Sequence, residues 1–135
     1  TEEIRVRAPI DVAFDALLVE LGRENRGVND APMPMVLEAW PGGRWFRDLG
    51  EGNGHWWGSV QAVRRPNLLE ISGPLMMSFP VASNVQYRLK AEGDETVITL
   101  RHTARSREGF ARGALQAAKW VVGKQGFFEF SETLF

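Results

Sequence analysis

Two histidines and a few charged residues are the side chains of this 135-residue chain that could take part in catalysis. His102 falls on the apolar side of a segment whose side chains alternate in character. A neutral imidazole enclosed there could act as a general base or hydrogen-bond a ligand carbonyl. A core histidine bonded to neighbouring backbone is the alternative. His55 begins a predicted strand beside a glycine-rich turn, where we expect it to be exposed.

Glu38 alternates with Val36 and Trp40, so its carboxylate can face either the interior or solvent. In the interior, desolvation would raise the pKa of Glu38 and make it a candidate acid. Arg44 and Arg47 could pair with Glu38 or bind a ligand carboxylate. The alternative for all three is a solvated sheet face with cross-strand pairs. His102 and Glu38 are therefore the candidate catalytic residues.

Other catalytic and metal-binding classes find no support in the sequence. The chain has no cysteine, and its two histidines are not clearly close together, so we expect no metal site. Its serines lie in no nucleophile-elbow pattern. The glycine-rich residues 50–54 lack the lysine and the following helix of a phosphate-binding loop, which favours a hairpin turn. No cofactor is expected.

The composition is that of an ordinary globular protein, with 44% hydrophobic and 24% charged residues and a formal net charge of -1. Nucleic acids and anionic membranes favour proteins with a basic face, so the near-neutral net charge argues against both as partners. No apolar run approaches the roughly 20 residues of a membrane span. The alternating charged residues at the start are unlike a signal peptide. We therefore expect a cytoplasmic protein without membrane insertion.

Aromatic residues are concentrated between residues 40 and 57, which hold four of the five tryptophans. Strict alternation places Trp56, Gly58 and Val60 on one strand face, where small neighbours would leave space beside the indole. Such aromatic walls are typical of ligand cavities, although plain core packing is the alternative. The candidate ligand-binding residues are Trp40, Trp45, Trp56, Met76, Met77, Phe79, Tyr87, His102 and Trp120.

The elements that would position these side chains begin with a strand over residues 2–8. A helix capped by Asp11 follows to about Gly22, with apolar residues at helical spacing. Residues 23–34 are polar and rich in Asn, Gly and Pro, which indicates a loop with room for a short helical turn. Its length makes it a candidate lid or cavity wall, and a solvated connector is the alternative.

Alternation and turn residues then predict strands over residues 35–40, 44–49, 55–65, 68–72, 83–92 and 96–104. Consecutive hairpins imply an antiparallel sheet. After Ser106 the apolar period changes to that of a long helix, which must cover the apolar face of the sheet. The sequence thus predicts a single α+β domain over residues 1–135. In this helix-grip arrangement, about seven antiparallel strands wrap around a long C-terminal helix and leave a cavity beneath it.

Several motifs resemble those of the START-like (SRPBCC, Bet v-like) superfamily. The opening strand followed by Ala8-Pro9-Ile10-Asp11 resembles the start of such domains. The double-glycine hairpin of residues 41–45 resembles the branch named for activators of a heat-shock-chaperone ATPase (AHSA-type). Residues 58–63 and 66–71 are similar to its strand pair, and residues 95–102 to its strand before the last helix.

The resemblance implies a helix-grip fold with an elongated cavity under the last helix. Superfamily members bind lipids, hormones, polyketides or other apolar molecules, and a minority are enzymes. We therefore favour non-catalytic binding of a small apolar or amphipathic ligand. The alternatives are a polyketide cyclase- or dehydratase-like enzyme using His102 and Glu38, and a cochaperone-like interaction module. A homodimer through a strand edge or the Phe-rich end of the chain stays open.

Overall fold

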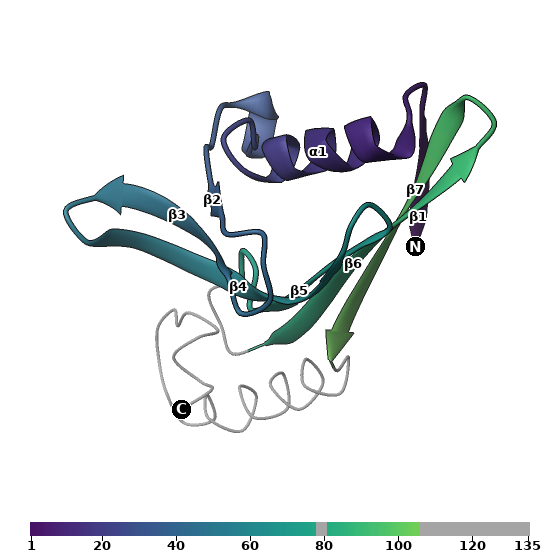
Figure 1. The fold of residues 1–135 in the computed structure, drawn as a ribbon. Coiled ribbons are helices and arrows are strands. Elements are labelled where there is room, and N and C mark those ends of the chain that lie inside the picture. Colours follow the sequence, from purple (N-terminus) through teal and green to yellow (C-terminus); the bar gives the residue numbers. More distant parts are fainter. Residues whose placement is uncertain (78–80, 106–135) are drawn as a thin grey trace.

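A curled antiparallel sheet of seven strands and one α-helix make up the described part of the protein (Figure 1). The computed structural model describes residues 1–77 and 81–105. The elements in chain order are β1 (Glu2–Val6), α1 (Ile10–Leu21), the 3-10 helix η1 (Val28–Asp30), β2 (Val36–Leu37), β3 (Arg44–Gly50), β4 (Asn53–Arg64), β5 (Leu68–Gly73), β6 (Ala82–Glu92) and β7 (Glu95–Arg105).

The strands are ordered β1-β7-β6-β5-β4-β3-β2, and each pair of neighbours is antiparallel. All but one of these pairs are consecutive in the chain, as the predicted hairpins require. The exception is β1, which pairs with β7 and brings the start of the chain beside residues 96–100. This curled sheet with one helix fits the predicted helix-grip fold. The predicted C-terminal helix and the single-domain prediction both involve residues 106–135, outside the described residues.

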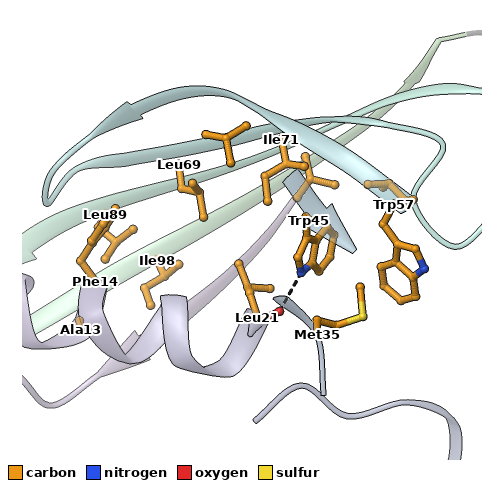
Figure 2. Packing of buried hydrophobic residues seen from close by; sticks show 13 residues of the cluster. Ala13, Phe14, Leu21, Met35, Trp45, Trp57, Leu69, Ile71, Leu89 and Ile98 are labelled. Carbon is orange, nitrogen blue, oxygen red and sulfur yellow. Dashed lines mark hydrogen bonds between the residues drawn. The ribbon is translucent and has the colours of Figure 1, made fainter. Parts of the chain in front are cut away.

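The core forms where α1 packs on one face of the sheet, over β6 and β7 (Figures 1 and 2). Phe14 is 1% exposed, and Leu69 and Ile71 on β5 are fully buried. These side chains lie on the apolar faces that the sequence pattern predicts. Side chains return to the same face about every 3.6 residues in α1 and every two residues in the strands. The opposite sheet face carries polar side chains such as Glu70, whose carboxylate accepts hydrogen bonds from Asn84 and Gln86 across the β5–β6 ladder.

Two local predictions are wrong. Asp11 does not cap α1; Pro9 is the N-cap residue and Asp11 lies in the first turn, where its charge faces the positive helix end. The strand predicted over residues 35–40 is reduced to Val36–Leu37. Its ladder ends because the Glu38 carboxylate, rather than the Glu38 carbonyl, accepts the hydrogen bond of the Arg44 backbone N–H at 2.9 Å.

The double-glycine turn between β2 and β3 is packed against β4. Gly42 N–H donates to the Val60 carbonyl at 2.8 Å, and Val60 N–H donates to the Gly43 carbonyl at 2.7 Å. Gly42 has a φ of 83°, which favours glycine, and a Cβ on Gly43 would lie 1.9 Å from the Glu38 carbonyl oxygen. Gly42 therefore allows the left-handed turn conformation, and Gly43 allows the close approach of the turn to the Glu38 carbonyl.

Candidate functional site

A largely apolar pocket of about 530 Å³ lies where the end of α1 and the loop after it meet the sheet. It is lined by Leu21, Asn25, Arg26, Gly27, Val28, Met33, Trp45, Trp57, Met76 and Tyr87. Most of these side chains are apolar or aromatic and only a few are polar, which is the usual composition of a small-molecule site. We call this space the α1 pocket.

The floor of the α1 pocket is rigidly built from buried residues. Leu21, Trp45 and Trp57 are each less than a tenth exposed. The Trp45 indole N–H donates a 2.7 Å hydrogen bond to the carbonyl of Leu21 in the last turn of α1 (Figure 2). That carbonyl has no partner within the helix, so the bond both satisfies it and fixes the indole. The hydrogen bond between Trp45 and Leu21 thus connects β3 to α1 in the pocket floor.

The loop between α1 and β2 forms one wall of the pocket, which is one of the two alternatives that the sequence left open. Backbone hydrogen bonds tie the two arms of the loop together, from Met33 N–H to the Asn25 carbonyl and from Met35 N–H to the Gly22 carbonyl, both at 2.9 Å. The Asn25 side chain adds a 3.1 Å bond to the Met33 carbonyl. These bonds hold the lining residues Asn25 and Met33 opposite the tryptophans of the floor.

Tyr87 and Arg26 are the ionisable residues that line the α1 pocket within the described part of the chain. Burial raises the pKa of the Tyr87 hydroxyl, because the charged phenolate loses solvation there. The phenol is therefore neutral at physiological pH and can donate or accept a hydrogen bond. Arg26 is exposed at the rim, where its guanidinium donates to the Asp30 carbonyl at 2.9 Å.

Three of the predicted ligand-binding residues line this pocket, namely Trp45, Tyr87 and Met76. Trp40 does not, and it is 59% exposed beyond the end of β2. Met77 and His102 are likewise absent from the lining. Phe79 and Trp120 lie outside the described residues. The pocket therefore gathers part of the predicted set and adds residues of the loop after α1.

The assignment of Trp56 to the apolar face of β4 is wrong. A register shift in the β3–β4 ladder pairs Trp45 with Gly58 but Phe46 with Trp56, so Trp57 is an additional residue in β4. Such a bulge breaks the alternation on which the prediction relied. Trp57 is consequently buried and lines the α1 pocket, whereas Trp56 is 47% exposed. Trp56 instead borders an open hollow beside the β3–β4 hairpin with Phe46, Arg47 and His55.

Glu38 lacks the environment of a catalytic acid. Its carboxylate accepts two hydrogen bonds from the Arg44 guanidinium, at 2.8 and 3.1 Å, besides that of the Arg44 backbone N–H. These bonds lower the pKa of Glu38, the opposite of the shift that burial without a partner would produce. The Arg44 guanidinium also lies 4.6 Å from the centre of the Phe46 ring. The cross-strand pair is the alternative that the sequence left open.

His102 and Glu38 are not joined in the described structure. His102 is exposed on β7, where it pairs with Val85 of β6. Glu38 follows β2, the strand at the opposite edge of the sheet from β1 and β7. No hydrogen bond or ion pair connects them within residues 1–77 and 81–105. His55 is exposed, as predicted. The geometry therefore provides no acid–base pair in the α1 pocket.

Sequence reasoning missed Trp57, Arg26 and Asn25 as lining residues. The bulge that turns Trp57 inward depends on pairing between β3 and β4, which a single-strand pattern does not contain. The length of residues 23–34 made a cavity wall one of two alternatives but did not indicate which side chains would face the cavity. In the described residues no cluster of three or more His, Asp or Glu side chains could hold a metal ion. The helices among them are too short or too polar to cross a membrane.

A family model described as "Dihydrodipicolinate reductase, C-terminus" matches residues 59–134. A curated protein of Bdellovibrio bacteriovorus, named 4-hydroxy-tetrahydrodipicolinate reductase, is 42% identical over 50 residues, which are 36% of this chain and 22% of that protein. A protein of the same name from Haloarcula marismortui is 40% identical over 50 residues, covering 36% of this chain and 20% of that protein. The chain thus spans about a fifth of the length of these relatives.

Solved structures with the same fold cover most of the chain. CalU16 from Micromonospora echinospora is 25% identical with a TM-score of 0.56, over 89% of this chain and 66% of that one. DynU16, from the dynemicin biosynthetic locus, is 18% identical with a TM-score of 0.56, over 88% of this chain and 42% of that one. Txn09, an anthrahydroquino-γ-pyrone synthase solved with a bound compound, is 16% identical with a TM-score of 0.51, over 76% of this chain and 73% of that one.

Proposed function

We propose a ligand-binding function for this chain, which belongs through its residues 59–134 to the family described as dihydrodipicolinate reductase, C-terminus. The ligand is a small apolar or amphipathic molecule held in the α1 pocket. The observation that carries this proposal is the pocket itself, with its buried floor of Leu21, Trp45 and Trp57 and its hydrogen-bonded loop wall. Catalysis by His102 and Glu38 is not part of the proposal.

The pocket suits an apolar body with few polar groups. Its volume of about 530 Å³ falls within the usual range of small-molecule sites, about 300–1,000 Å³. Covering the tryptophan and methionine side chains of the lining would contribute roughly 25 cal/mol per Å² of apolar surface removed from water. The flexible side chains of Met33 and Met76 can adapt to ligands of different shape.

Intrinsic tryptophan fluorescence tests the proposal, because Trp45 and Trp57 lie in the pocket lining. A panel of fatty acids, flavonoids and aromatic polyketides should include compounds that quench or shift the emission and raise the melting temperature. Leu21→Trp should fill the floor and abolish binding, whereas Val12→Trp, at an exposed α1 position outside the lining, should leave binding intact. A panel without a single binder would contradict the proposal.

The family match favours a second candidate function, reduction of 4-hydroxy-tetrahydrodipicolinate, the activity in the names of the curated relatives. The reductase activity belongs to proteins of which this chain spans about a fifth. The test is to follow oxidation of NADH or NADPH by the purified chain with that substrate. Turnover would establish this second function, and its absence would count against it.

Placement in the chaperone-ATPase activator branch is a finer proposal, supported by the double-glycine hairpin of residues 41–45. Its turn is packed against β4 through Gly42, Gly43 and Val60. A cochaperone should bind the chaperone in a pull-down and stimulate its ATPase. If the chain shows neither effect, the cochaperone proposal is contradicted, although the resemblance of the hairpin remains.

A further inference from the structure

We propose that the ligand of the α1 pocket carries an anionic group, such as a carboxylate, which Arg26 binds at the rim. This inference rests on the proposed function, since it names the chemical class of ligand for the same pocket. It starts from the uneven distribution of charge and hydrogen-bonding groups around the lining.

Among residues 1–77 and 81–105, the lining contains one cation and no anion. Arg26 is the one described lining residue that is charged at neutral pH, because the Tyr87 phenol is neutral there. No Asp or Glu is among the described lining residues. An apolar cavity with a single guanidinium at its rim favours a ligand with an apolar body and a negative group at one end.

Hydrogen-bond donors around the pocket that have no partner in the described residues also favour a ligand with several acceptor atoms. The indole N–H of Trp45 is bonded to the Leu21 carbonyl, but that of Trp57 has no partner in the described part of the chain. The Tyr87 hydroxyl likewise has no partner there. Together with Arg26 they supply donors for ligand oxygens, whereas the oxygen acceptors among the described lining side chains are Asn25 Oδ1 and the Tyr87 hydroxyl.

The loop holds Arg26 at the rim independently of any ligand. Arg26 forms a backbone bridge with Pro32, and the next residue, Gly27, donates its N–H to the Ala31 carbonyl at 2.9 Å. The guanidinium donates to the Asp30 carbonyl, while its distance to the Asp30 carboxylate is 3.7 Å. An exposed ion pair of this length is weak, so a ligand carboxylate can compete with Asp30 for Arg26.

The test compares three matched aromatic probes by isothermal titration calorimetry on the full chain. They are 2-naphthoate, the neutral 2-naphthamide and the cationic 2-naphthylmethylammonium, which share the same ring system. We expect 2-naphthoate to bind about tenfold more tightly than the amide, as one charge-assisted hydrogen bond allows. The cation should bind most weakly.

Two substitutions assign this preference to Arg26. Arg26→Gln should weaken 2-naphthoate to the affinity of the amide and leave the amide unchanged. Arg23→Gln, at an exposed position of the same loop outside the lining, is the matched control and should retain the preference. Asp30→Asn removes the competing carboxylate, and because Asn also tolerates the left-handed φ of 57° found there, it should increase 2-naphthoate affinity a few-fold.

The outcomes separate this inference from the proposed function. Equal binding of 2-naphthoate and 2-naphthamide, or a preference that survives Arg26→Gln, would overturn the anionic class while leaving ligand binding intact. Weaker 2-naphthoate binding by Asp30→Asn would also overturn it. If neither these probes nor any compound of the fluorescence panel binds, the proposed function fails together with the inference. Circular dichroism melting of each variant identifies any loss that comes from unfolding.

Discussion

Trp45 and Trp57 meet edge to face, with ring centroids 5.0 Å apart and an interplanar angle of 82°. Aromatic pairs of this geometry contribute about 0.5–1.5 kcal/mol beyond the area that they bury. Trp45 is fixed by its hydrogen bond to Leu21, and it supports Trp57, which comes from the bulge in β4. The floor of the α1 pocket therefore depends on α1, β3 and β4 together.

Trp45→Phe should destabilise the protein more than Trp57→Phe. Both variants keep an aromatic ring, but only the first leaves the Leu21 carbonyl without its donor, at a cost of about 1–3 kcal/mol. The Trp57 indole N–H has no partner in residues 1–77 and 81–105, so its loss should cost less. Urea unfolding of the two variants measures the difference. Equal stabilities would show that the Trp45–Leu21 bond contributes little.

Gly43→Ala should disrupt the turn between β2 and β3. The added Cβ would lie 1.9 Å from the Glu38 carbonyl oxygen, so backbone atoms must move. We expect a loss beyond the usual range of about 0.5–3 kcal/mol. Gly93→Ala is the matched control, because its φ of 62° strains alanine but its Cβ would meet no atom within 4 Å. The control should lose about 1–2 kcal/mol in chemical denaturation, and a Gly43→Ala protein as stable as the control would contradict the close approach.

Glu38 should remain ionised to a lower pH than an ordinary glutamate. Its pKa is lowered mainly by hydrogen bonds from the Arg44 side chain and backbone. The stability that this pair contributes is therefore present above the usual glutamate pKa and is lost as pH falls through the folded value. Carbon-13 NMR titration of the Glu38 carboxyl measures the pKa directly. Arg44→Gln should raise it, whereas Arg47→Gln, which forms no bond to Glu38 in the described residues, should leave it lowered.

The hydroxyl of Tyr87 should ionise only above the usual tyrosine pKa of about 10. Burial raises the folded value, so the unfolded chain loses its proton first and stability falls as pH rises from the unfolded towards the folded pKa. Tyr87 is the only tyrosine, so tyrosinate absorbance reports this group alone. Titration in concentrated urea should return the usual value. A folded-state titration at the urea value would place the phenol in solvent rather than in the pocket wall.

Local sequence patterns were sufficient to predict the order and type of most elements. Period-two patterns predicted the strands that form β3 to β7, and apolar residues at helical spacing predicted α1, because local periodicity matches the geometry of each element. The glycines and polar residues after α1 indicated a loop, and its length made a cavity wall one of two alternatives; that loop lines the pocket. The double glycine of residues 42–43 marked the turn that is packed against β4.

Which side chains meet in the pocket depends on contacts between elements that lie far apart in the sequence. The bulge that buries Trp57 and exposes Trp56 arises from the pairing of β3 with β4, and that register is absent from the local pattern. The pairing of Glu38 with Arg44 depends on the turn that brings the two residues together. Likewise, Arg26, Trp57 and Tyr87 line one pocket although they lie far apart in the sequence. The loop that carries Arg26 is held by backbone hydrogen bonds between its two arms, and such contacts depend on the whole fold.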